Sequence, residues 1–281
     1  MLRSFYVPCR HLSSTHGRTL LFGSVRLLSA QASPEGPVVS ETNRAEATLK
    51  RFWKTVGIET RDNSLAITLD KRALKTPSGN TLLLPLHKRL AATLIATEWD
   101  SQETLLKPHA LPVTSIASRA LDALGDQDTR EDVSNALLEY LDTDTICFHQ
   151  DDPPPLVELQ KQHWEPLLTW ARTSLDVEIQ TFDSILFHSQ PEATKQKLKT
   201  VLKDFDQWEL AAMERITYAT KSFIIALALV KNRLDTEQAA LAAQVEVNSQ
   251  IQRWGEVEDT HDVDYHDVRR QIGSAASLLS S

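Results

Sequence analysis

The chain has 281 residues, 24% of them charged, and a formal net charge of −8 at pH 7. This acidic balance argues against nucleic acid or anionic lipid as the main partner, because both would repel it. The longest strongly apolar run, Phe223 to Val230, is far shorter than the roughly 20 residues that cross a bilayer, so it predicts a buried helix. The glycines after Gly36 are isolated, which excludes nucleotide-binding loops, and we expect no cofactor.

Residues 1–33 contain no acidic residue, and the first acid is Glu35. Their composition, rich in Arg, Ser and Leu, is typical of a mitochondrial transit peptide, so we expect import into the matrix. A basic tail without a targeting role is the alternative. Removal of its four arginines lowers the basic residues from 30 to 26 against 38 acids, so the net charge falls from −8 to −12. The arginines are Arg3, Arg10, Arg18 and Arg26. Cys147 then stands alone, and no intramolecular disulfide can form.

Residues 34–50 are polar and predict a linker. Residues 51–114 predict a small β-rich N-terminal domain with one packed helix, because short β-prone runs alternate with turn residues. The helix is expected over Leu86 to Ser101, with Leu86, Leu90 and Leu94 on the apolar face and Trp99 extending it. The β-prone runs are Thr55 to Ile58, Leu65 to Leu69 and Thr81 to Leu84.

Residues 115–281 predict a larger helical C-terminal domain, so the fold class is α+β. Asp128 is the expected cap of one helix, with Glu131 at the capping-box position, and Asp235 is the expected cap of another. The remaining helices are expected after Pro153 to Pro155, over Glu192 to Leu202, over Phe205 to Val230 and over Thr236 to Trp254.

The helix from Thr236 to Trp254 carries the candidate binding residues. Glu246 and Gln250 form a polar ridge beside Trp254, and a carboxylate, an amide and an aromatic ring in one strip suit contact with another protein. The alternative is that Trp254 belongs to the core and that Glu246 is simply solvated.

Three other groups invite a chemical reading. Asp142 and Asp144 form an Asp-x-Asp pair, for which a structural role in a turn is favoured over metal binding. Cys147 and His149 would share one face of a strand, although a buried cysteine is ordinarily a small apolar residue. The segment from His261 to Asp267 holds two histidines and three aspartates, but the histidine spacing of i, i+5 does not suit one helix face.

Three longer tracts resemble one family. Residues 96–102 (ATEWDSQ), 140–147 (YLDTDTIC) and 250–258 (QIQRWGEVE) are similar to the mitochondrial assembly chaperone that handles the alpha subunit of the ATP synthase catalytic head. Residues 69–77 (LDKRALKTP) also resemble that family's hairpin motif. The similarity runs from about Phe52 to Asp262 in the family's order and spacing.

The resemblance implies a chaperone that is not an enzyme, with a β-rich N-terminal and a helical C-terminal domain. It implies that the protein holds the free alpha subunit and releases it during assembly, with Glu246, Gln250, Trp254 and Gly255 on the family's E-x-x-x-Q-x-x-x-W-G pattern. Asp259-Thr260 depart from the family and leave a client contact there open. We expect a monomer. The competing readings are a stable subunit of a larger complex and a matrix metal-dependent hydrolase using Asp142, Asp144, His261 and Asp264.

Overall fold

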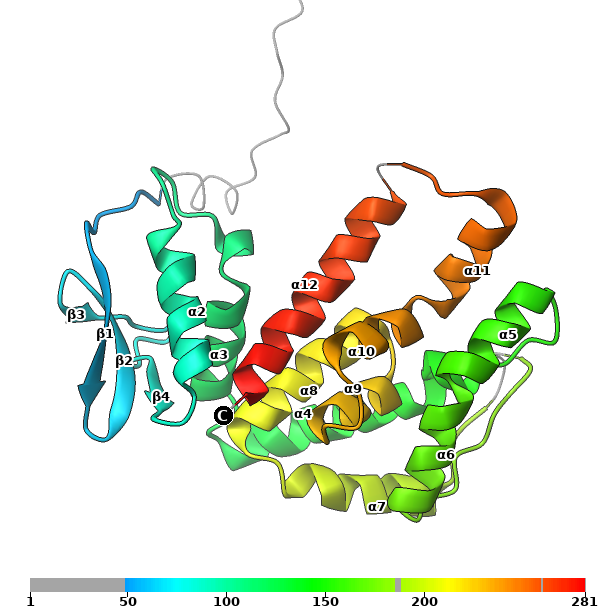
Figure 1. Ribbon diagram of the computed structural model, residues 1–281. Coiled ribbons are helices and arrows are strands. Elements are labelled where there is room, and N and C mark those ends of the chain that lie inside the picture. Colours follow the sequence, from blue (N-terminus) through cyan, green and yellow to red (C-terminus); the bar gives the residue numbers. More distant parts are fainter. Residues whose placement is uncertain (1–48, 185–187, 259, 281) are drawn as a thin grey trace, which may run out of the picture.

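The computed structural model describes residues 49–184, 188–258 and 260–280, so the predicted transit peptide and most of the predicted linker lie outside them. The described chain begins with a small antiparallel sheet, followed by helices (Figure 1), which confirms the α+β class. Its strands are β1 (Val56–Arg61), β2 (Ser64–Leu69), β3 (Arg72–Ala73) and β4 (Leu83–Pro85).

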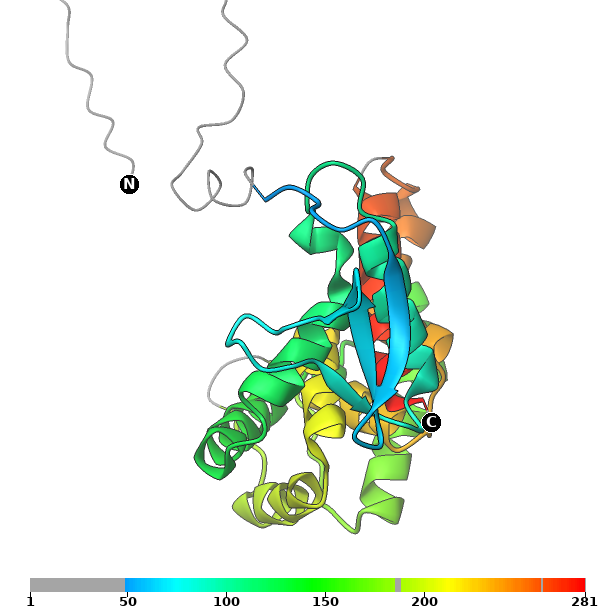
Figure 2. The same cartoon turned by 90° about the vertical axis from the view of Figure 1, so that its left-hand side faces the viewer.

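The second strand, β2, is the centre of the sheet. It pairs with β1 along one edge and with the short strands β3 and β4 along the other, always antiparallel. Asp62 and Asn63 form the two-residue turn between β1 and β2 with φ of 47° and 59°, values that suit a type I′ hairpin turn. Figure 2 views the molecule from the sheet side and shows the strands in front of the helices.

Helix α2 (Arg89–Asp100) packs on β1 and β2. The buried face of α2 consists of Ala91, Ala92 and Ile95, whereas Leu86 and Leu90 are 43% and 48% exposed. The predicted apolar face was therefore wrong at its first two leucines. Small alanine side chains allow the helix backbone to approach the sheet closely, and this contact decides which face turns inward.

Trp99 joins α2 to the next helix, α3 (Pro112–Asp122). Its ring lies 5.0 Å from that of Trp53, and its Nε1 donates a hydrogen bond of 3.2 Å to Thr114 Oγ1. The neighbouring Glu98 carboxylate accepts hydrogen bonds from the backbone amides of Val113 and Thr114, at 2.7 and 2.9 Å. Glu98 thus satisfies two amides at the first turn of α3 that have no partner within the helix.

Helix α8 (Gln207–Thr220) lies in the middle of the helical part, against α3, α9 (Phe223–Val230) and α12 (His261–Leu279) (Figure 1). All eight residues of α9 are buried, which confirms the buried helix expected there. The other elements are η1 (Pro108–Ala110), α4 (Gln127–Glu139), η2 (Tyr140–Thr143), η3 (Thr145–Cys147), α5 (Pro154–His163), α6 (Glu165–Ser174), α7 (Glu192–Lys203), α10 (Thr236–Ala243) and α11 (Val245–Trp254).

The sheet and the helices share one apolar core, which runs from Trp53 to Leu278. Lys88, 4% exposed, donates a hydrogen bond of 2.8 Å from Nζ to the carbonyl of Leu278, so the entrance of α2 is tied to the end of α12. Helix α3 runs through the expected boundary between residues 114 and 115. The division into two domains stays a prediction.

Two helix predictions need correction in α4 and α8. The cap of α4 is Asp126, which accepts a hydrogen bond of 2.9 Å from the Thr129 amide, and Asp128 lies in the first turn instead. The expected helix over Phe205 to Val230 is two helices, because Lys221 adopts a left-handed φ of 55° between α8 and α9. Ser222 then caps α9 by accepting from the Ile225 amide.

The predicted helix over Thr236 to Trp254 is also divided. Gln244 leaves helical geometry, with φ −106° and ψ 19°, and separates α10 from α11. The predicted cap Asp235 is confirmed, and it forms a reciprocal capping box with Gln238.

Candidate functional site

The three candidate binding residues lie together on the exposed face of α11. Glu246, Gln250 and Trp254 follow one another at i, i+4 and i+8, and Trp254 is 70% exposed. On the other side of the helix Val245 and Ser249 are buried, where α11 packs against α5 (Figure 1). The structure therefore places Trp254 on the surface rather than in the core.

Further apolar side chains are exposed in the connection after α11 and at the start of α12. Val257, in the connection after α11, is 58% exposed, and Val263 and Tyr265, in the first two turns of α12, are 63% and 44% exposed. We call the described residues 245–258 and 260–267 the α11–α12 arm. Exposed apolar side chains can mark a protein contact, and the sequence analysis did not single out Val257 or Val263. Two apolar residues within an acidic segment were the sequence feature that could have identified them as contact residues.

The arm is acidic as well as apolar. Its exposed acids include Glu246 on α11, Glu256 and Glu258 in the connection, and Asp262 at the start of α12. The exposed cation of α11 is Arg253, whose guanidinium lies 5.0 Å from the centre of the Trp254 ring. Such a surface is complementary to a partner with apolar and positively charged side chains.

A hydrogen-bonded cluster fixes the arm to α10 and α12. Gln244 is 4% exposed; its Nε2 donates to Asp264 Oδ2 at 3.1 Å, and its Oε1 accepts from Arg269 Nη1 at 2.7 Å. Arg269 also binds both carboxylate oxygens of Glu237, at 2.6 and 3.0 Å, and its guanidinium lies 3.4 Å from the centre of the Tyr265 ring. The sequence reading did not assign a role to Gln244 or Arg269, because their partners are distant in the chain.

Comparison with known proteins decides the family. A family model described as ATP12 chaperone protein matches residues 50–172. The mitochondrial protein atp12 of Schizosaccharomyces pombe is 35% identical over 241 residues, which cover 83% of each chain. The mitochondrial protein ATP12 of Saccharomyces cerevisiae is 31% identical over 286 residues, covering 86% of this chain and 87% of the yeast protein.

The chain belongs to the ATP12 chaperone family. A crystal structure of Atp12 from Paracoccus denitrificans superposes with a TM-score of 0.70 at 26% identity, covering 82% of this chain and 97% of the bacterial one. Membership of the ATP12 family supports a chaperone of ATP synthase assembly and confirms the resemblance read from the sequence. The two fungal relatives are named as mitochondrial proteins, which supports a mitochondrial location for this ATP12-family chain.

The Asp-x-Asp pair of this ATP12-family chain holds the fold together. Asp142 Oδ2 lies 2.6 Å from Lys195 Nζ, and Asp142 Oδ1 accepts from the Gln190 amide at 2.8 Å. Partial burial raises the pKa of Asp142, but these hydrogen bonds and the Lys195 charge outweigh it, so the pKa lies below the usual value. Asp144 is fully buried and accepts from the Ile224 amide at 2.9 Å; burial raises its pKa to about 6.

The other two residues of the alternative hydrolase site also form hydrogen bonds within the protein. His261 Nδ1 accepts a hydrogen bond of 2.9 Å from the Val257 amide, and Asp264 binds Gln244. Among the residues that the structure describes, no group of three or more His, Cys, Asp or Glu side chains could hold a metal ion. Nor is any helix in the described ranges both long and apolar enough to span a bilayer.

Cys147 and His149 do not lie in a strand, as the sequence reading assumed. Cys147 ends the short helix η3 and is buried, and burial raises the pKa of its thiol. His149 Nε2 lies 3.1 Å from the carbonyl oxygen of Ile146, and burial lowers the pKa of its imidazole. A thiol that resists ionisation is a poor nucleophile, so this pair has the properties of core residues.

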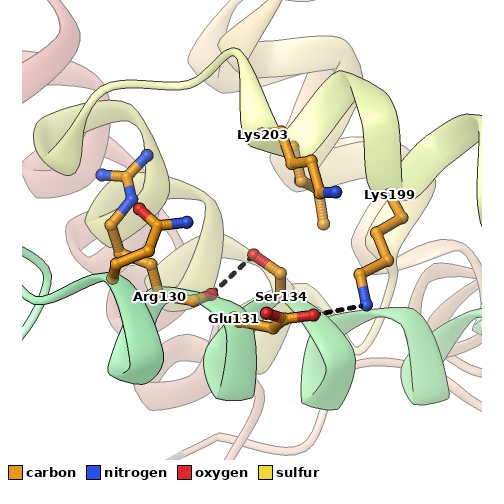
Figure 3. A pocket seen from close by; sticks show the side chains of 7 residues that line it. Arg130, Glu131, Ser134, Lys199 and Lys203 are labelled. Carbon is orange, nitrogen blue, oxygen red and sulfur yellow. Dashed lines mark hydrogen bonds and ion pairs between the residues drawn. The ribbon is translucent and has the colours of Figure 1, made fainter.

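In a small pocket between α4 and α7, several polar side chains bind one another or backbone carbonyls (Figure 3). Its volume of about 30 Å³ suits little more than one water. Lys199 forms an ion pair with Glu131 at 3.0 Å, and Ser134 Oγ donates to the carbonyl of Arg130 at 2.7 Å. Arg130 itself donates to the carbonyls of Leu124 and Phe205. Arg130 and Lys199 therefore have structural roles.

Proposed function

We propose that this protein binds the free alpha subunit of ATP synthase in the mitochondrial matrix, keeps it from aggregating, and releases it as the catalytic head assembles. Glu246, Gln250 and Trp254 form the client-binding face. The observation that carries the proposal is the 70% exposure of Trp254 beside two exposed polar residues on a family member's helix. Family membership and the sequence resemblance are the basis for proposing the alpha subunit as the client.

The surface chemistry supports a reversible holding role. A subunit of an obligate complex exposes a large apolar interface before it is assembled, and that interface promotes aggregation. Trp254, Val257 and Val263 offer apolar contact area, and Trp is enriched where binding energy concentrates. A modest contact of this kind can be displaced by a larger permanent interface, so release requires no nucleotide.

Glu246 provides the test, because it is exposed and makes no hydrogen bond or ion pair within the described part of the chain. Glu246→Lys should leave the melting temperature unchanged, since exposed helix positions tolerate charge reversal within roughly 0.5 kcal/mol. Capture of the alpha subunit should weaken by about 2 to 5 kcal/mol if Glu246 forms a buried charge pair across the interface. The readouts are capture from matrix extract and light scattering of aggregating alpha subunit.

Glu139→Lys is the matched control, because Glu139 is exposed on α4 and lies outside the arm. It makes the same change in net charge and should bind the alpha subunit normally. Normal capture by a folded Glu246→Lys protein would refute the site, and capture of another subunit in place of alpha would refute the client. We further propose a monomer, for which light scattering of the full chain should give about 31.6 kDa.

A further inference from the structure

A second pocket lies at the junction of η1, α3, α8 and α12, with a volume of about 340 Å³. This volume is at the small end of the range that binds ligands, roughly 300 to 1,000 Å³. Two arginines, two serines and one histidine contribute to its lining, so the pocket combines positive charge with hydroxyl groups. These residues are Arg215, Arg270, Ser115, Ser274 and His109.

Arg215, on α8, is the unusual member of the pocket. It is partly buried, yet its side chain makes no hydrogen bond or ion pair with any residue that the structure describes. Two other arginines of the helical part form ion pairs: Arg119 binds Glu214 at 2.9 Å, and Arg269 binds Glu237 at 2.6 Å. A partly buried guanidinium without an acceptor has lost hydration that nothing in the pocket replaces.

The second arginine of the pocket, Arg270, already has partners within the protein. Arg270, on α12, forms an ion pair with Asp267 and donates to the carbonyl of His109 at 3.2 Å. Asp267 is also the acceptor for Gln271 at 2.6 Å. The Asp267 carboxylate thus balances only one of the two guanidinium charges, those of Arg215 and Arg270. The pocket therefore keeps a net positive charge within an acidic protein.

We propose that this pocket binds an oxyanion, a carboxylate or phosphate group, held by Arg215 with support from Arg270. Guanidinium groups bind both oxyanions through paired N–H donors, and these charge-assisted bonds are stronger than neutral ones. Ser115 Oγ, which has no partner within the described residues, is a further donor at the same pocket. The site is separate from the proposed client face and does not depend on the client's identity.

The pocket lies where a bound anion would connect several helices. The bound anion would contact α8, α12 and η1 together, and α12 continues from Arg270 to the arm at Val263, seven residues or roughly 10 Å away. An anion here would therefore stabilise the helix that carries the C-terminal part of the arm.

Inorganic phosphate is the first probe. Thermal unfolding of the full chain is followed while phosphate replaces chloride at constant ionic strength. The melting temperature of the wild type should rise by roughly 3 °C once phosphate reaches about ten times its dissociation constant. Arg215→Gln should abolish this rise without lowering the melting temperature in chloride, because the Arg215 side chain has no hydrogen bond or ion pair to lose within the described residues. Arg233→Gln, at an exposed arginine that lacks a side-chain partner among the described residues, should keep the full response.

Acetate in place of phosphate distinguishes the two sources of the oxyanion. A rise with acetate alone assigns the pocket to a carboxylate, and a rise with phosphate alone assigns it to a phosphate group. An equal response of the wild type and Arg215→Gln would overturn the proposal, as would no response of the wild type to either anion. Neither result depends on alpha-subunit capture, so the two proposals fail separately.

Discussion

The side-chain amide of Gln244 donates a hydrogen bond of 3.1 Å to Asp264 across 20 positions of the chain. This contact joins the break between α10 and α11 to the first turn of α12. Because Arg269 donates to the other polar atom of the same amide, one buried side chain holds both ends of the α11–α12 arm. The direction of the candidate binding face therefore depends on Gln244, a residue outside that face.

We expect Gln244→Ala to lower the free energy of unfolding by about 1 to 3 kcal/mol. The substitution removes two hydrogen bonds and truncates a buried side chain. Alpha-subunit capture should also weaken, since the arm loses its fixed direction. Gln252→Ala is the control, because Gln252 is exposed on α11 and should change stability by no more than roughly 0.5 kcal/mol. Equal urea unfolding curves for the two variants would contradict the role given to Gln244.

Trp99→Arg should destabilise the protein strongly. The change removes the contact with Trp53 and the hydrogen bond to Thr114, and it places a charge where α2 meets α3. Loss of a core aromatic alone costs about 3 to 5 kcal/mol, against a typical domain stability of about 5 to 15 kcal/mol. Soluble yield and melting temperature should both fall. Trp254→Arg, at a side chain that is 70% exposed, should melt like the wild type; equal melting of the two variants would show that Trp99 is not structural.

Asp144 gives stability an unusual dependence on pH. Burial raises the pKa of its carboxyl to about 6 in the folded protein, against about 3.9 in the unfolded chain. The folded state therefore binds the proton more tightly, so this contribution is present below about pH 4 and is lost as pH rises through 6. We expect the wild type to lose about 2 kcal/mol relative to Asp144→Asn between about pH 4 and pH 7. Urea unfolding at several pH values measures the difference.

Asp142→Asn supplies the opposite control. The pKa of Asp142 is lowered in the folded protein, so its contribution is present above the unfolded pKa and is lost as pH falls through the folded value. The stability advantage of the wild type over Asp142→Asn should therefore shrink at low pH. Parallel stability curves for wild type and Asp144→Asn would mean that Asp144 is not buried as an ionisable group.

Much of the fold could be predicted because it depends on interactions between residues that are close together in the sequence. Asp235 caps α10 through an amide three residues away, and α9 is buried throughout because all its side chains are apolar. The β1–β2 hairpin follows from Asp62 and Asn63, which tolerate a positive φ. The sequence alone also placed Glu246, Gln250 and Trp254 on one helix face, since their spacing determines that.

The tertiary structure decided what depends on distant partners. The buried face of α2 is Ala91, Ala92 and Ile95 rather than the leucines, because the helix packs closely on the sheet. The predicted helix over Thr236 to Trp254 breaks at Gln244, where Asp264 and Arg269 bind the side chain. Likewise, Arg215, which has no side-chain partner in the described part of the chain, becomes informative only beside Arg270, 55 positions later. Spacing along a sequence specifies neighbours on one helix, whereas contacts between helices specify which side chains lose water and which lack a partner.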